Sequence, residues 1–387
     1  MRHTKLSPLF SRPDYSDRRI LSVYLNVNES SQINLNRGFE KRLKDITASI
    51  RRTITDPAES EIFANAAAHI QGFVSVYEVH ARTLVMFFDS TDGFFWYEAL
   101  NVPIETTARW EKELFLQPLI GILDEFEAYG IALLDHANLR LFTMSLGELK
   151  EAAHRNFSRR AVQHIRGVGT DHLGSAHHVQ RKADERIRAN VRLMIQDIQS
   201  MMRSNGIEHL ILAGSPEITA ELQKMLPKSL ALRVIGVLDL SMEATRDKVF
   251  TAATEIAERY ERDCEETTVR EVVTATAKGQ GAVAGLRDTL PLVNEGRVWQ
   301  LIYSAGLRWP GSECSKCASL FATEASSCSS CGGKTCRVPD VIERAVEHAA
   351  RHNARIEVVK EKAAEMLNLE GGIAAFLKAR AARVRTV

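Results

Sequence analysis

The chain has 387 residues, of which 45% are hydrophobic and 26% are charged, and its formal net charge is +1. This length allows two or three domains, each with its own core. The balanced charge excludes a protein that is basic overall, so any RNA-binding face must be local, and no apolar run is long enough to cross a membrane.

The amino-terminal third predicts an α+β domain over residues 1–112. Alternating β-branched and aromatic residues indicate strands, and amphipathic spacing indicates helices. The expected elements are a strand over Ile20–Val27, a helix from Asn36 to about Thr55, a helix from Pro57 to about Val76, and a hairpin of Thr83–Asp89 and Phe94–Leu100. Two interpretations stay equally open: an RNA- or ribosome-contacting module, or a plain structural domain.

The middle third predicts an α/β domain over residues 113–265. Strands and helices alternate with short links, which favours a mixed or largely parallel sheet. The expected elements are a helix over Leu116–Ala128, strands over Gly130–Asp135 and Arg140–Met144, a polar segment over Leu149–Gly174, a helix over Ser175–Ser204, a strand over His209–Ala213, a helix from Gly214–Glu217, a strand over Leu232–Leu240, and a helix from Ser241 to about Cys264.

The remaining residues, 266–387, predict a second mixed-sheet α/β domain. A helical pattern ends at Gly296, the expected position of a helix C-terminal glycine, and Val298–Tyr303 follows as a buried strand. A helix over Asp340–His352 and a strand over Ala354–Val359 repeat this order after a cysteine-rich insertion. Gly279-Gln280-Gly281 is interpreted as a linker turn. The predicted fold class is therefore α/β in three domains: an α+β domain followed by two mixed-sheet domains.

The insertion, residues 312–336, contains two pairs of cysteines. The spacing Cys314-x2-Cys317-x10-Cys328-x2-Cys331 is typical of a zinc ribbon, in which two tight turns supply four thiolates to one tetrahedral Zn²⁺. Four protein ligands leave no open position, so the zinc is expected to be structural. The alternative is a set of free or redox-active cysteines. Cysteines crowded in this way favour a reducing cytoplasm, and the charged amino terminus is not a signal peptide.

A second stretch, from Arg155 to Arg192, carries a local charge of +6, since nine Arg or Lys residues face three acids. Such a segment in a chain of balanced charge predicts contact with RNA phosphates. The alternative is a solvated helix face. We refer to residues 155–192 as the basic segment.

Two stretches of the third domain resemble the archaeal and eukaryotic class-1 peptide chain release factors and Pelota. They are Thr289–Leu307, with the pattern L-x5-G-x-V-x2-L-I, and Gly371–Leu377. The domain order is similar to that of the bacterial branch of this family, which includes the Balon-type ribosome hibernation factors. The resemblance implies a release-factor-like architecture of three domains, with the zinc ribbon inserted in the third. The Asn-Ile-Lys-Ser tetrapeptide for stop-codon reading is not found.

The resemblance also places the basic segment where release factors carry the catalytic Gly-Gly-Gln. Laid on this chain, Gly-Gly-Gln-Ser-Ala falls on residues 172–176, His-Leu-Gly-Ser-Ala, so that Gly174 occupies the Gln position. No catalytic residue is therefore predicted, although Gln180 is a weak candidate to replace it. The expected ribosome-contacting residues are Arg160, Arg166, His172, Gly174, Ser175, His177, His178, Arg181, Lys182 and Arg186.

These observations predict a ribosome-binding translation factor that occupies the A site without peptide release, in hibernation or stress protection. The alternative is an enzyme: a peptidyl-tRNA hydrolase or rescue release factor with a non-standard loop that uses Gln180 or His178. A third possibility is an RNA-binding protein unrelated to translation. The expected partners are ribosomal RNA and, by resemblance, a translational GTPase such as EF-Tu. No membrane partner is expected.

Overall fold

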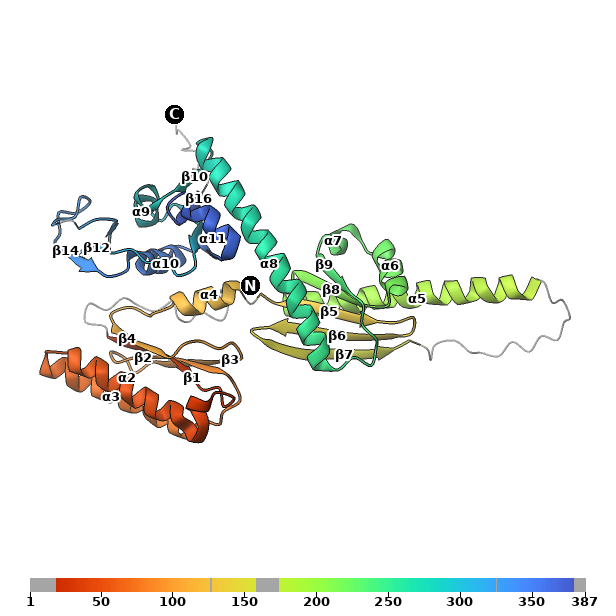
Figure 1. Cartoon of the computed structure of the whole chain (residues 1–387), viewed down its shortest axis with the longest axis horizontal. Helices are drawn as coiled ribbons and strands as arrows, with labels where there is room; N and C mark the ends of the chain where they lie inside the picture. The colour runs from red at the N-terminus through yellow and green to blue at the C-terminus, as the bar shows by residue number, and fades with distance from the viewer. Residues whose placement is uncertain (1–18, 126, 158–173, 325, 379–387) are drawn as a thin grey trace, which may run out of the picture. The chain divides into compact units, whose positions relative to one another are not determined.

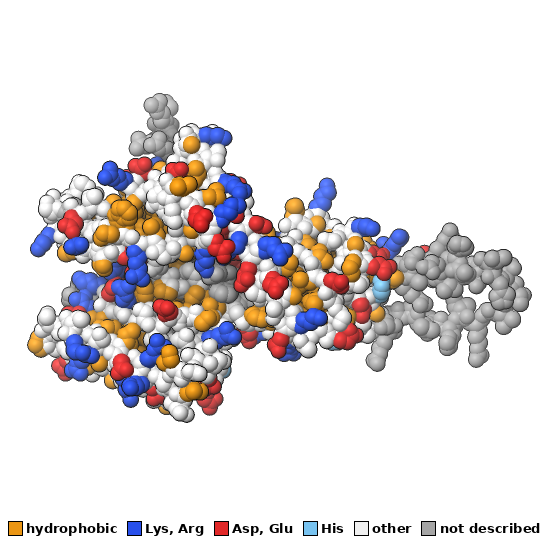
Figure 2. Space-filling model, in the orientation of Figure 1, with side chains coloured by type: hydrophobic (Ala, Val, Ile, Leu, Met, Phe, Trp, Pro, Cys, Tyr) orange, Lys and Arg blue, Asp and Glu red, His pale blue; other side chains and the backbone are white. Residues whose placement is uncertain are grey.

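The computed structural model describes residues 19–125, 127–157, 174–324 and 326–378, with the backbone alone for 123–125, 174–184 and 186 (Figure 1). The chain forms two compact units. One combines Met1–Glu125 with Arg262–Val387, and the other is Phe126–Glu261. Helices and mixed sheets occur in both, which confirms the α/β fold class. On the face drawn in Figure 2, acidic and basic side chains are interspersed over the described surface.

The amino-terminal part of the first unit is an antiparallel sheet with helices on one face (Figure 1). The sheet has the order β3-β2-β1-β4, and its elements in chain order are β1 Ile20–Asn26, η1 Gln32–Arg37, α2 Gly38–Thr53, α3 Pro57–Val76, β2 Thr83–Asp89, β3 Phe95–Leu100 and β4 Thr107–Glu111. The predicted strands and helices are confirmed, and β4 is an addition. Phe39 and Leu43 of α2 pack with Phe63 of α3 against the sheet.

The carboxy-terminal part of the first unit is a mixed sheet in the order β10-β16-β11-β15. Its elements in chain order are β10 Ala282–Ala284, α9 Leu286–Asn294, β11 Val298–Ser304, α10 Val341–Arg351, β15 Arg355–Val359, α11 Glu361–Asn368 and β16 Ile373–Leu377. Strands β11 and β15 are parallel, and β16 runs antiparallel to β11. The helix–strand order that the sequence predicts on both sides of the insertion is confirmed.

The insertion folds as a small three-stranded sheet of its own, in the order β13-β12-β14. Its strands are β12 Gly311–Cys314, β13 Leu320–Phe321 and β14 Thr335–Val338. The Asn294 side chain at the end of α9 holds β13 by two hydrogen bonds of 2.9 Å, one to the Leu320 carbonyl oxygen and one from the Leu320 amide. One side chain thus mimics a strand neighbour and fixes the insertion to the domain that carries it.

A cluster of charged side chains within the first unit centres on Arg344 of α10. Its guanidinium lies 2.5 Å from Glu111 at the end of β4, 3.2 Å from Glu347 and 3.7 Å from Glu313 of β12. Burial raises the pKa of Glu347 well above its usual value. The cluster also pairs Arg351 with Glu113 at 2.6 Å. Because removal of Arg344 would leave the buried carboxylate of Glu347 without this cation, Arg344 is the group on which this packing depends most.

The second unit is a five-stranded mixed sheet in the order β7-β6-β5-β8-β9. Its elements are β5 Tyr129–Leu134, β6 Asn138–Ser145, β7 Glu148–Asn156, α5 Gly174–Asn205, β8 His209–Gly214, α6 Pro216–Met225, α7 Lys228–Ala231, β9 Val234–Leu238 and the part of α8 (Arg246–Ala277) up to Glu261. Helix α4 Gln117–Glu125 and the rest of α8 belong to the first unit. Alternate residues of β5 point to opposite faces. Ala132 packs with Met194 of α5, whereas Ile131 packs with Val249 of α8.

One strand was missed in this part of the chain and one helix end was predicted wrongly. The segment expected to be polar after Leu149 begins within strand β7, an edge strand whose side chains are half-buried or exposed. The helix expected to end near Cys264 continues to Ala277, because Val269 and Val272 are fully buried and no glycine or proline interrupts the chain before Gly279.

The turn from β8 into α6 depends on Gly214. Its φ is 151°, and a Cβ atom there would lie 2.3 Å from the Leu134 carbonyl oxygen. We expect Gly214→Ala to lower the free energy of unfolding by about 2 kcal/mol or more, since backbone must move to relieve the clash. Denaturant unfolding measures this. Gly72→Ala is the matched control: it lies in α3 with open space around it and should stabilise the protein by about 0.5–1 kcal/mol. Equal effects would contradict the expectation.

Candidate metal centre and basic segment

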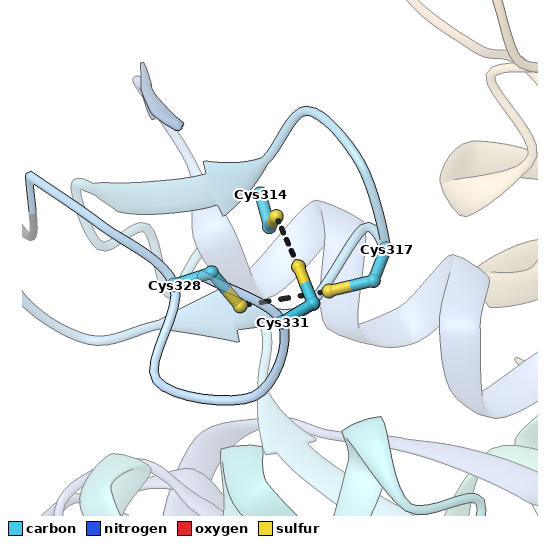
Figure 3. Close-up of side chains that lie close together, drawn as sticks. All are labelled: Cys314, Cys317, Cys328 and Cys331. Carbon is cyan, nitrogen blue, oxygen red and sulfur yellow. Dashed lines mark hydrogen bonds between the residues drawn. The ribbon is translucent and has the colours of Figure 1, made fainter. Parts of the chain in front are cut away.

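The four paired cysteines meet at one point of the insertion (Figure 3). Cys314 ends strand β12 and Cys317 lies in the turn that follows, while Cys328 and Cys331 belong to the opposite turn. The sulfurs of Cys314 and Cys331 are 3.5 Å apart, as are those of Cys317 and Cys328, and all four lie within 4.8 Å of one another. These distances are too long for disulfides, which need about 2.05 Å.

The separations fit a tetrahedral thiolate site. Four sulfurs at about 2.3 Å from one Zn²⁺ lie about 3.8 Å from each other. Within the described residues this is the one group of three or more Cys, His, Asp or Glu side chains with metal-binding geometry. The predicted cluster of four cysteines is therefore confirmed, and it could hold a metal ion.

The backbone around the sulfurs is shaped to leave them room. A Cβ atom at Gly333 would lie 3.1 Å from the Cys314 sulfur and 3.2 Å from the Cys331 sulfur, so a side chain there would crowd the centre. The Lys316 amide points at the Cys314 sulfur at 3.4 Å. Amides directed at a thiolate favour its charged form, which is the form that binds metal.

Neighbouring groups within the centre shift the pKa values of Cys317 and Cys331. The Ser319 hydroxyl, 3.2 Å from the Cys317 sulfur, is the main cause that lowers the pKa of Cys317 to about 6. At Cys331 the Gly333 amide favours the thiolate, but the nearby Cys317 and Cys314 sulfurs outweigh it and raise the pKa to about 12. Four sulfurs this close cannot all ionise unless a cation compensates their charge, so the donor set itself fits a divalent soft metal.

Sequence reasoning missed one residue of this centre, Ser319, since no cysteine-like spacing signals its role. The other cysteines lie elsewhere. Cys336 is exposed on β14, and Cys264 is half-buried in α8. Neither belongs to the four-sulfur group.

The basic segment is only partly within the described residues. Arg160, Arg166 and His172 lie outside them. From Gly174 onward the backbone forms α5, which confirms the helix expected from Ser175, and this helix carries the remaining residues expected to contact the ribosome: Gly174, Ser175, His177, His178, Arg181, Lys182 and Arg186. Val191, Met194 and Ile198 are buried farther along α5. The ribosome contacts themselves stay a prediction.

One comparison with protein families found a match. Residues 115–258 match the model of "Bacterial archaeo-eukaryotic release factor family 10". Over these residues the chain is similar to that release-factor family. The matched stretch runs from just before α4 into α8 and includes the basic segment. It does not include the third-domain stretches Thr289–Leu307 and Gly371–Leu377, and it supports the release-factor-like interpretation from a different part of the chain.

The chain also resembles solved structures of translation factors. It is 16% identical to the archaeal termination factor aRF1 (TM-score 0.26, covering 98% of this chain and 97% of that one). It is 12% identical to Archaeoglobus fulgidus Pelota (0.35; 76% and 78%) and 10% identical to S. cerevisiae Dom34, a termination-like factor in RNA quality control (0.40; 76% and 84%). At these TM-scores the structures add no argument to the family match. No curated protein matches the chain.

None of the helices in the described part of the chain is both long and apolar enough to cross a membrane.

Proposed function

We propose that this release-factor-like protein is a ribosome-binding translation factor that fills the A site without releasing the nascent peptide, as a hibernation or protective factor in the cytoplasm. The observation that supports the proposal most is the family match over 115–258, which spans the position where release factors carry Gly-Gly-Gln and where this chain has His172-Leu173-Gly174. A glycine-rich tip lets backbone approach the tRNA end, and a Gln orients the water. This chain has one glycine and no such side chain there.

The partners proposed with this function are ribosomal RNA at the A site and a translational GTPase such as EF-Tu. The division into domains 1–112, 113–265 and 266–387 is part of the proposal. A ribosome-bound form of archaeal Pelota, together with ABCE1, is among the similar structures, and S. cerevisiae Dom34 interacts with Hbs1. Those partners belong to those proteins. Whether this chain uses a GTPase is tested by ribosome binding with and without EF-Tu·GTP.

The metal proposed for the four-cysteine centre is one structural Zn²⁺. Cys314, Cys317, Cys328 and Cys331 would all be ligands, so no position is left for a water or substrate. Zinc would supply folding energy to an insertion whose strands β12, β13 and β14 bury few apolar side chains. It would not take part in chemistry.

Ribosome binding through the basic segment makes a quantitative prediction. The change Arg181→Gln, Lys182→Gln and Arg186→Gln should weaken co-sedimentation with ribosomes, because three phosphate-facing charges are lost. The slope of log affinity against log salt concentration should fall by up to about 0.9 per lost contact. The matched control is Lys224→Gln, Lys228→Gln and Arg287→Gln, three cations spread over α6, α7 and α9. If both variants bind like the parent chain, the basic segment is a solvated face.

A further inference from the structure

The surface of helix α2 carries more positive charge than its ion pairs neutralise. Residues 37–53 contain six Lys or Arg residues and two acids, a local charge of +4 in a chain of net charge +1. Arg37 and Glu40 pair with each other, which leaves Asp45 as the one exposed acid of this helix. The five remaining cations are all exposed: Lys41, Arg42, Lys44, Arg51 and Arg52. We call these five side chains the α2 stripe.

The cations of the α2 stripe have no acidic partner among the described residues. Arg51 donates to the Ser60 hydroxyl and Arg52 to the Ala48 carbonyl oxygen, each at 3.3 Å, and neither acceptor carries charge. Lys41 and Lys44 stand three residues apart on the same side of the helix, where like charges destabilise it. A helix that keeps such repulsion is stabilised when a polyanion neutralises it.

The opposite side of α2 is fixed in the core, so the α2 stripe is held in a defined orientation. Phe39 and Leu43 are fully buried against the sheet. At the start of the helix, the Arg37 guanidinium donates to the carbonyl oxygens of Val74 and Tyr77, at 2.6 and 3.1 Å, at the end of α3. The five cations therefore project from a rigid element, and a rigid charged surface loses little entropy when it binds.

The preceding segment, η1, is equally well anchored. The side-chain amide of Asn34 lies 3.0 Å from the Asn28 carbonyl oxygen and 3.1 Å from that of Asn26. Its neighbours Ile33 and Leu35 are 61% and 60% exposed. Two aliphatic side chains are too few to insert the domain into a bilayer, and the apolar face of α2 is already buried. This geometry favours binding to a polyanion with regularly spaced charges over binding to a lipid surface.

From these contacts we propose that the α2 stripe binds the phosphate backbone of RNA. The stripe spans from Lys41 to Arg52, about 16 Å at 1.5 Å per residue, which is long enough to follow several successive phosphates. It lies outside the residues that match the family model and gives the amino-terminal domain a role of its own. That this RNA is ribosomal rests on the function proposed above.

The test compares the full chain with the variant Lys41→Gln, Arg42→Gln and Lys44→Gln. Glutamine keeps helix propensity and removes charge, and circular dichroism checks that the variant is folded. The control is Lys224→Gln, Lys228→Gln and Arg287→Gln, with the same change in net charge. Binding is measured by fluorescence anisotropy to a short labelled RNA duplex and by co-sedimentation with ribosomes, each at several salt concentrations.

We expect the α2 variant to bind the RNA duplex at least about tenfold more weakly than the control, with a salt slope smaller by up to about 2–3. Equal binding by the two variants would overturn the proposal. Loss of duplex binding in a chain that fails to sediment with ribosomes would support the α2 stripe and refute the ribosomal function. Phosphatidylserine vesicles are a third probe: if the substitutions weaken binding to vesicles and leave RNA binding intact, the surface faces membranes and the proposal is wrong.

Discussion

Elemental analysis of the chain purified without chelator is expected to give one zinc per molecule, and Cys314→Ser is expected to lose it. The loss of folding free energy on removal of the zinc should be large, because structural zinc supplies about 10–16 kcal/mol of apparent binding energy in small zinc-finger peptides. Here the loss should be local. Amides of β12, β13 and β14 should exchange with solvent quickly, while those of β1 and β2 stay protected, because that sheet has its own buried core.

Cys336→Ser is the control for this experiment. Cys336 is exposed and lies outside the four-sulfur group, so its replacement should leave both the zinc content and the exchange pattern unchanged. Purified protein without zinc, or zinc retained by Cys314→Ser, would refute the proposed site. Free or redox-active cysteines would then be the better account.

The second large effect is expected in translation. Added to a purified translation system, the protein should inhibit synthesis, and it should release no labelled peptide from ribosomes that hold peptidyl-tRNA. The reason is chemical: at residues 172–174 the chain has His, Leu and Gly, with no side chain at the expected Gln position to orient water. An A site that is filled without chemistry blocks entry of tRNA.

A matched experiment introduces the Gly-Gly-Gln motif into this chain. His172→Gly, Leu173→Gly and Gly174→Gln together install Gly-Gly-Gln, and appearance of peptide release in this variant would confirm the position in the ribosome that we propose. Peptide release by the parent chain itself would be equally informative. Multiple-turnover release that disappears in Gln180→Ala or His178→Ala would establish the enzyme instead.

The sequence predicted those elements of the fold whose residues signal their own boundaries. The bounds of α3 were predicted residue for residue, since Pro57 marks its first turn and a helical pattern of small and apolar residues follows. Strand β2 was predicted equally well from its buried apolar run. In contrast, β4 (TARWE) and β7 (ELKEAAHRN) were missed. Both are edge strands that bury little, so their residues show no clear alternation.

The candidate site also has features that the sequence predicted and features that it did not predict. Spacing alone predicted that four cysteines meet, because two tight turns can be recognised from local sequence. The role of Ser319 could not be predicted, since it depends on how the turn after Cys317 directs the Ser319 hydroxyl in space. For the basic segment, the position opposite Gly-Gly-Gln came from the resemblance, and the charge pattern by itself did not distinguish an RNA contact from a solvated face.

Two adjacent residues of strand β12 have different roles, and this affects how deletion and point variants of the insertion should be designed. Cys314 belongs to the four-sulfur centre, whereas Glu313, the residue before it, lies 3.7 Å from Arg344 in the half-buried charged cluster. A deletion variant with a short linker in place of residues 312–336 would therefore lack an acid of that cluster as well as the metal ligands. Its phenotype would mix two causes. Point substitution at Cys317, which is exposed and not adjacent to Glu313 in the sequence, separates the two contributions and is the better starting point for genetic work on the insertion.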